Sequence, residues 1–144
     1  MRRLLLIIPA VILALASYSR TIIVKNLEEL HAASKNALPG DVIILKNGEW
    51  KDVQIKLESI GTKEKPIIYK AEKPGGVIIT GNSRLALGGE YIEVQGLLFT
   101  RGYAGDKAVI EFRTSKDKLA NHCRVTGSAI DGFNNPKRMD ENYQ

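Results

Sequence analysis

The chain has 144 residues, of which 44% are hydrophobic and 26% are charged, so a wholly disordered polypeptide is excluded. Its formal net charge of +5 is a mild basic excess, which does not indicate nucleic-acid binding but suits an anionic partner. Because Cys123 is the only cysteine, no internal disulfide can form, and we expect a buried thiol in a fold held together by packing.

Residues 1–19 have the pattern of a secretory signal peptide. Two arginines near the start precede an apolar run over residues 4–16, and small residues follow, so that cleavage after Ala16 or after Ser19 fits. The alternative is a membrane anchor, but the run of about 13 apolar residues is shorter than the roughly 20 that span a bilayer. We therefore expect a secreted or periplasmic protein without stable membrane insertion after cleavage, and a mature net charge of about +3 (5 minus the 2 lost arginines).

One short amphipathic helix is predicted near the start of the mature chain, after a short strand over residues 21–25. Asn26 is a favourable N-cap residue, and Glu29 lies at the spacing of a capping box. Apolar and small residues recur at helical intervals up to Leu38, and Pro39-Gly40 then ends the pattern. These signals predict a helix over residues 26–38.

After Gly40 the sequence consists of short apolar, β-branched runs separated by turn residues such as Asn47-Gly48 and Pro74-Gly75-Gly76. This pattern predicts an all-β domain, either a sandwich, a barrel or a solenoid. We expect strands at residues 42–45, 67–71, 77–80, 91–94, 97–99, 109–112 and 123–125, and an alternating apolar segment at 53–57.

An internal repeat favours the solenoid. At one constant offset, the apolar positions and the glycine of residues 92–99 match those of residues 123–130, with Gly96 over Gly127. We therefore predict a right-handed parallel β-helix, with a β-sandwich as the alternative. The helix at 26–38 would cap the first coil, since a solenoid end exposes core side chains and strand edges. No such cap follows the last coil, so we expect residues 20–144 to be the N-terminal part of a domain that is truncated at its C-terminal end.

Several segments, in order, resemble the chondroitinase B/alginate lyase family of polysaccharide lyases. They are Ala37 to Leu45, Asn47 to Val53, Gly61-Thr62 with Pro66-Ile67, Ala71 to Gly75, Ile79 to Ser83, Leu87 to Tyr91, Val94 to Leu97 with Phe99, and Asn134 to Arg138. The stretch Val109 to Ser115 is more similar to the alginate-cleaving members. Together these segments cover essentially the whole mature chain.

The resemblance implies a lyase that cleaves an acidic uronate polysaccharide by β-elimination, with alginate favoured and dermatan or chondroitin sulfate next. In the family a calcium ion neutralises the uronate carboxylate, a lysine removes the proton on C5, and an arginine assists. No counterpart of these groups is found in this chain, so the catalytic residues are expected downstream of Gln144. Calcium is expected for the full-length enzyme, without any calcium ligand in this chain.

Three basic residues are candidate substrate-binding groups: Arg113, Lys137 and Arg138. They would line the edge of a groove that receives an anionic polysaccharide, and the alternative is that they are solvated turn charges. A non-catalytic carbohydrate-binding module or a structural β-helix module is the alternative to an enzyme. Nothing in the sequence indicates an oligomeric state or a nucleic-acid partner.

Overall fold

The computed structural model describes residues 19–135, which form twelve strands and one helix. The signal-peptide prediction for residues 1–19 lies almost wholly outside the described residues. No helix within residues 19–135 is long and apolar enough to span a membrane.

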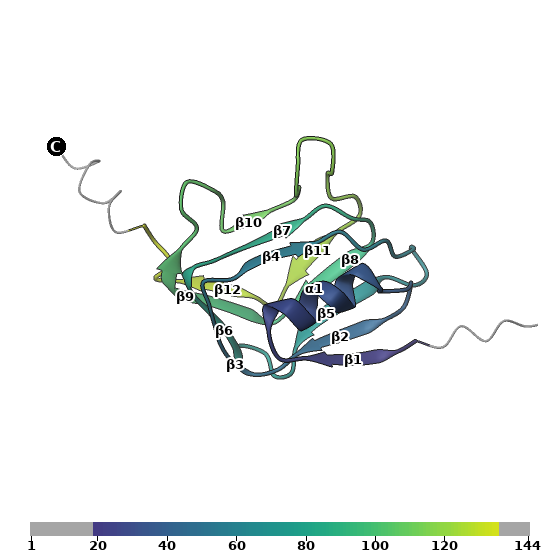
Figure 1. The fold of residues 1–144 in the computed structure, drawn as a ribbon, viewed down its shortest axis with the longest axis horizontal. Coiled ribbons are helices and arrows are strands. Elements are labelled where there is room, and N and C mark those ends of the chain that lie inside the picture. The colour runs from purple at the N-terminus through teal and green to yellow at the C-terminus, as the bar shows by residue number, and fades with distance from the viewer. Residues whose placement is uncertain (1–18, 136–144) are drawn as a thin grey trace, which may run out of the picture.

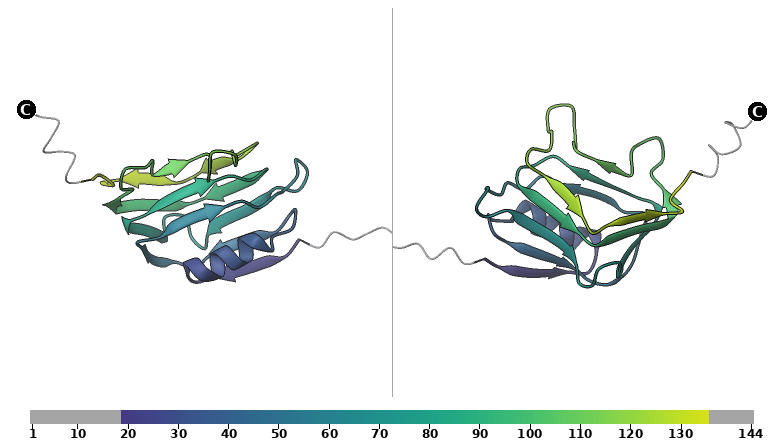
Figure 2. Two further views of the ribbon diagram at one scale, coloured as in Figure 1. Left: turned by 45° about the horizontal axis from the view of Figure 1, so that its top comes forward. Right: turned by 180° about the vertical axis from the view of Figure 1, so that it is seen from behind.

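The strands form three parallel sheets around one core (Figures 1 and 2). The chain passes through the sheets in turn and then returns to the first, one coil further along, so each strand pairs with its counterpart in the neighbouring coil. This arrangement confirms the predicted parallel β-helix. Sheet A contains β1 (Thr21–Val24), β2 (Val42–Leu45), β5 (Ile67–Ala71), β8 (Ile92–Gln95) and β11 (Arg124–Thr126); sheet B contains β3 (Gly48–Lys51), β6 (Val77–Asn82), β9 (Leu97–Tyr103) and β12 (Ala129–Asp131); sheet C contains β4 (Gln54–Leu57), β7 (Arg84–Leu87) and β10 (Ile110–Glu111).

The core consists of side chains that stack in register from coil to coil. In sheet B, Trp50 pairs with Ile79, Ile79 with Phe99, and Phe99 with Ile130. Trp50, Ile79 and Phe99 are buried. Because side chains alternate between the two faces of a strand, each sheet contributes one such apolar ladder to the interior and points its other side chains outward.

The predicted repeat is confirmed in two sheets. Val125 pairs with Val94 in sheet A and Ile130 pairs with Phe99 in sheet B, both at the constant offset of the repeat. Gly96 and Gly127 form the corner between the two sheets with φ of 76° and 56°, a conformation that glycine adopts without strain. Earlier coils differ from one another in length. The chain takes more residues to pass from β3 to β6 than from β6 to β9.

Helix α1 (Leu27–Lys35) covers the core at the first coil (Figure 2), where it contacts β1, β2 and β4. The Asn26 side chain accepts a hydrogen bond from the Glu29 N–H (2.9 Å), and the Glu29 carboxylate accepts one from the Lys25 N–H (2.8 Å). Leu30 is only 1% exposed and points into the solenoid. The capping role is therefore confirmed, although the helix ends at Lys35, three residues before the predicted end.

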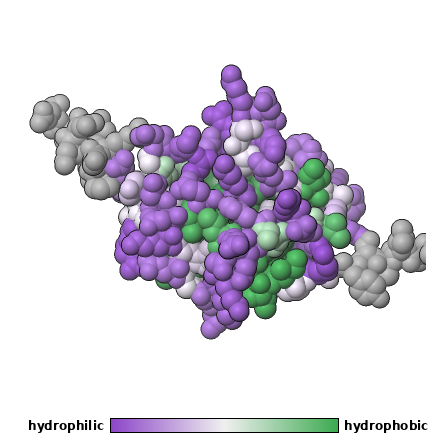
Figure 3. Space-filling view, in the orientation of Figure 1, coloured by the Kyte–Doolittle hydropathy of each residue, from purple (hydrophilic) through white to green (hydrophobic). Residues whose placement is uncertain are grey.

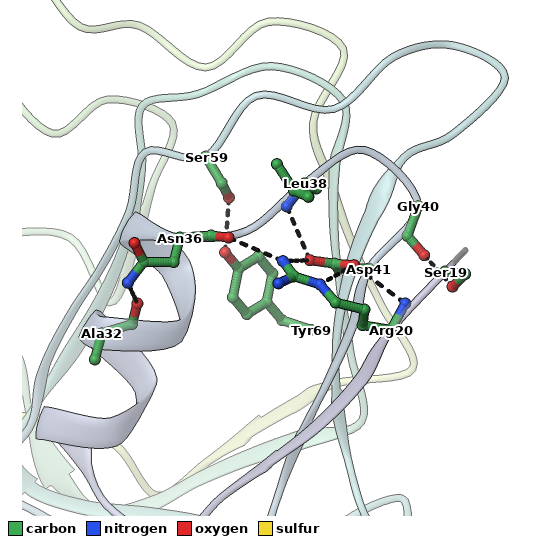
Figure 4. A network of polar contacts seen from close by, with 9 residues as sticks. All are labelled: Ser19, Arg20, Ala32, Asn36, Leu38, Gly40, Asp41, Ser59 and Tyr69. Atoms are coloured by element: carbon green, nitrogen blue, oxygen red, sulfur yellow. Dashed lines mark hydrogen bonds and ion pairs between the residues drawn. The ribbon is translucent and has the colours of Figure 1, made fainter. Parts of the chain in front are cut away.

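The turn after the helix is fixed by one buried carboxylate (Figure 4). Asp41 is 0% exposed, pairs with the Arg20 guanidinium at 2.5 Å, and accepts a hydrogen bond from the Leu38 N–H at 2.8 Å. The hydrogen bond from Arg20 lowers the pKa of Asp41 against the opposing effect of burial, and the Leu38 N–H adds to the lowering. The Pro39-Gly40-Asp41 segment thus has a structural role, tying the start of β1 to the start of β2.

Other differences from the predicted elements are local. Strand β7 was not predicted, because its sequence Arg-Leu-Ala-Leu lacks the β-branched residues that mark the other strands. Of the turn predicted at Asn47-Gly48, the second residue already belongs to a strand, since β3 begins at Gly48. Cys123 is half-buried rather than buried, and burial raises the pKa of its thiol.

Candidate functional site

The outer face of sheet A carries a group of polar side chains on three successive coils. Lys70 of β5, Gln95 of β8 and Thr126 of β11 stand in register, and beside them Glu93 pairs with Arg124. The in-register strands place these side chains on one surface because every second residue of a strand faces outward. We call this surface, with the nearby Lys63, the sheet A face.

The carboxylate of Glu93 accepts hydrogen bonds from neighbouring side chains. It accepts hydrogen bonds from Arg124 Nη2 (2.5 Å) and Gln95 Nε2 (2.8 Å). Burial raises the pKa of Glu93, but the hydrogen bonds from Arg124 and Gln95 outweigh burial, so the pKa lies below its ordinary value. Glu93 is therefore ionised at neutral pH, and its charge is balanced by Arg124.

Two hollows open at either end of β8 and β11. One, of 370 Å³, is lined by Lys63, Pro66, Tyr91 to Glu93 and His122 to Arg124; the other, of 350 Å³, is lined by Lys70 to Glu72, Pro74, Gln95, Gly96, Thr126 and Gly127. Among residues 19–135, no carboxylate lies within ion-pair distance of Lys63 or Lys70. Each hollow thus has one lysine whose charge is not balanced by a close acidic partner, which favours an anionic ligand.

A larger hollow, of 850 Å³, lies elsewhere, between α1 and the segment that follows β4. Leu38 and Ile60, two of the exposed large apolar side chains, form part of its wall. The side of the molecule that carries α1 is otherwise largely hydrophilic, with apolar residues in a few small patches (Figure 3). This hollow is also lined by Lys35 and Lys56, so an unbalanced lysine does not distinguish it from the other two. We prefer the sheet A face because its polar side chains stand in register over three successive coils.

Comparison with known proteins identifies the family. The family described as Chondroitinase B matches residues 24–144, which is most of the sequence. The chain belongs to the Chondroitinase B family. No curated protein matches the sequence.

Three of the solved structures that are similar to this Chondroitinase B family member are lyases of polysaccharide lyase family 6. The alginate lyase AlyGC is 46% identical, with a TM-score of 0.78 over 81% of this chain and 16% of that chain. The lyase Pedsa3628 from Pseudopedobacter saltans is 38% identical, with a TM-score of 0.68 over 76% of this chain and 24% of that one. A mannuronic acid specific lyase from human gut microbiota is 32% identical, with a TM-score of 0.71 over 81% of this chain and 27% of that one. This chain therefore matches about a sixth to a quarter of the length of these relatives.

Arg113, the described one of the three predicted substrate-binding residues, lies beside sheet C. Its Nε donates a hydrogen bond to Glu111 (2.8 Å), which also pairs with Arg84 at 3.0 Å. The hydrogen bond from Arg113 is the main reason why the pKa of Glu111 lies below its usual value. Arg113 does not line either hollow of the sheet A face, and its role in substrate binding stays a prediction. Lys137 and Arg138 lie outside the described residues.

The acidic side chains of residues 19–135 do not fit a calcium site. No three Asp, Glu, His or Cys side chains of this part of the chain group together as metal ligands. The carboxylates with the shortest contacts instead have basic partners; these are Asp41, Glu58, Glu72, Glu93 and Glu111. The calcium expected for the full-length enzyme stays a prediction about coils outside this structure.

The sheet A face was not predicted from the sequence, although one signal for it was present. The repeat that aligns Val94 with Val125 also places Arg124 next to Glu93 and His122 next to Tyr91. Lys63 and Lys70 carry no comparable signal, because they come from a coil of different length.

Proposed function

We propose that this chain is the N-terminal portion of a secreted polysaccharide lyase that cleaves an acidic uronate polysaccharide by β-elimination. The observation that carries the proposal is the 46% identity to the alginate lyase AlyGC over 81% of this chain. Alginate is the favoured substrate, since a second similar structure is a mannuronic acid specific lyase, and dermatan or chondroitin sulfate is next. Secretion is supported by the signal-peptide pattern of residues 1–19.

The reaction sets the requirements for the complete site. A base removes the proton from C5 of the uronate ring, the bond between C4 and the glycosidic oxygen breaks, and a double bond forms between C4 and C5. The leaving oxygen takes up a proton. The negative charge of the uronate carboxylate must be neutralised, because neutralisation stabilises the carbanion-like transition state. We assign the base and the carboxylate-neutralising group to later coils, because the matched region is only 16–27% of the similar lyases.

In this proposal the described coils hold the polymer. The sheet A face offers Lys63 and Lys70 beside two hollows, and its acidic residue Glu93 is balanced by Arg124. Alginate, the favoured substrate, carries one carboxylate per sugar unit, so a surface with spaced cations suits it.

The test is to read the gene beyond the codon for Gln144 and to assay its full product on alginate, dermatan sulfate and chondroitin sulfate, with a neutral polysaccharide as control. Formation of the C4–C5 double bond is followed by its ultraviolet absorbance. We expect the absorbance to rise with alginate first and to stay flat with the neutral polymer.

A stop codon directly after Gln144, or a longer product that cleaves none of the three uronates, would overturn the proposal. Binding of alginate by such a product without any cleavage would instead support the alternative, a non-catalytic carbohydrate-binding β-helix module.

A further inference from the structure

Tyr91 and His122 form a stacked pair of rings on successive coils, at the edge of the sheet A face. The centroids of the two rings are 4.6 Å apart and the ring planes differ by 12°. Pro66 has the equivalent place in the preceding coil, because Ile67 pairs with Ile92. Three ring-bearing residues therefore stand at the same point of three consecutive coils.

The backbone at the two aromatic residues is strained. Tyr91 has a φ of 48° and His122 a φ of 53°, a region that residues with a side chain rarely adopt. At the neighbouring corner of the same two coils the positive φ belongs to Gly96 and Gly127. Asp52 and Arg101 also have a positive φ, so the feature particular to Tyr91 and His122 is the stacked pair of rings rather than the backbone conformation.

Hydrogen bonds to the adjacent coils hold Tyr91 in this conformation. Its N–H donates to the Asn121 carbonyl (3.0 Å), and its carbonyl accepts from the Ile67 N–H (3.0 Å). The ring thus projects from a backbone that is fixed on both sides, which is the kind of support that a binding group requires.

Several polar groups converge on the 370 Å³ hollow next to these rings. Within the described part of the chain, the Tyr91 hydroxyl, the ring nitrogens of His122 and the Lys63 ammonium have no hydrogen-bond partner, and Arg124 uses one terminal nitrogen on Glu93. A guanidinium has five N–H donors, so Arg124 can bind a further anion. The volume lies within the range of about 300–1,000 Å³ that is typical of small-ligand sites.

We propose that this hollow binds one carboxylate-bearing sugar unit of a uronate chain. Lys63 and Arg124 bind the carboxylate, while the Tyr91 hydroxyl and the His122 imidazole bind hydroxyl groups of the sugar ring. We call it the Tyr91 subsite; it rests on the proposed function for the nature of the polymer, and it takes no part in bond cleavage.

The experiment compares three variants of the full gene product. Lys63→Ala removes the proposed carboxylate ligand, Tyr91→Phe removes the hydroxyl but keeps the ring stack, and Lys51→Ala is the matched control. Lys51 is an exposed lysine of β3 in sheet B that lines neither hollow of the sheet A face. We expect Lys63→Ala to raise the KM for alginate about tenfold, as for loss of one charge-assisted hydrogen bond, with kcat unchanged. Tyr91→Phe should raise KM less, and Lys51→Ala should leave it unchanged.

The outcomes separate this proposal from the proposed function. If the unchanged protein cleaves alginate and all variants share its KM, the Tyr91 subsite is wrong while the lyase stands. If Lys63→Ala and Lys51→Ala raise KM equally, the effect is one of overall charge, and the subsite is again wrong. If the protein without substitutions cleaves no uronate, the proposed function fails. Calorimetric titration of the same variants with a short oligouronate then tests the Tyr91 subsite alone. Equal affinities of all proteins overturn the subsite, and a selective loss of affinity in Lys63→Ala and Tyr91→Phe supports it.

Discussion

The two ends of the described solenoid differ in how their core is covered. At the first coil, α1 lies over the interior and Leu30 is 1% exposed, whereas at the last described coil Ile130 is 54% exposed above the buried Phe99. The ion pairs differ in the same direction but by less, since the side chains of Arg20 and Asp41 are 46% and 1% exposed, and those of Arg124 and Glu93 are 68% and 11% exposed. Within residues 19–135, α1 thus covers the core at the first coil, whereas Arg124 and Thr126 of the last described coil are exposed polar residues of the sheet A face.

The largest expected effect is on the covered end. Leu30→Ala removes a buried side chain of α1 and should lower the free energy of unfolding by about 3 kcal/mol, through lost burial and the cavity that remains. In the 144-residue chain, Ile130→Ala is the matched change at the other end and should lower it by less than about 0.5 kcal/mol, because more than half of that side chain is exposed. Urea denaturation of both variants measures the difference, and equal losses would contradict the contrast between the two ends.

The ion pairs should show a smaller contrast in the same direction. Asp41→Asn leaves the Leu38 N–H and the Arg20 guanidinium with a weaker acceptor in a buried turn, and should cost about 2 kcal/mol of stability. Glu93→Gln affects a pair in which the carboxylate is largely buried but the arginine is 68% exposed, and it should cost less, about 1 kcal/mol. Thermal unfolding followed by circular dichroism compares them; a larger loss in Glu93→Gln would show that the sheet A face, rather than the turn at Asp41, holds the coils together.

The pH dependence gives the finest test of the buried carboxylate. The folded-state pKa of Asp41 lies below its unfolded value of about 3.9, so its contribution to stability is complete above that value and is lost as the pH falls through the folded pKa. The stability difference between the unchanged protein and Asp41→Asn should therefore shrink as the pH falls below about 4. Urea denaturation at a series of pH values measures it, and a difference that stays constant down to about pH 2 would mean that Asp41 has an ordinary pKa.

Most of the fold was predictable because its signals are local. The capping box at Asn26 and Glu29 marks the start of α1, and alternation of apolar residues marks Ile55 and Leu57 as inward-facing. The repeat was visible only between residues 92–99 and 123–130, because in both copies a single glycine joins the strands of sheets A and B. Where the turns differ in length, as before β6, the constant offset disappears and the coils no longer align by sequence.

The candidate site was less predictable, because it depends on how coils of unequal length stack. Glu58 pairs with Lys118 and bonds to Thr114 from a position 60 and 56 residues away, respectively. Likewise, Lys63 reaches the hollow beside Tyr91 from a turn with no repeat partner. Single basic residues such as Arg113 are easy to identify in a sequence. Their ion-pair partners are known only from the folded structure, in which residues of different coils lie side by side.

The most direct test of the central claim, that these coils hold a uronate chain while the cleaving groups lie in later coils, uses the 144-residue chain beside the full gene product. Both are mixed with alginate and calcium, and the ultraviolet absorbance of the C4–C5 double bond is recorded. The account predicts a flat trace for the 144-residue chain and a rising trace for the full product. A rising trace for the 144-residue chain would contradict it, and would place the proton-removing base within residues 1–144.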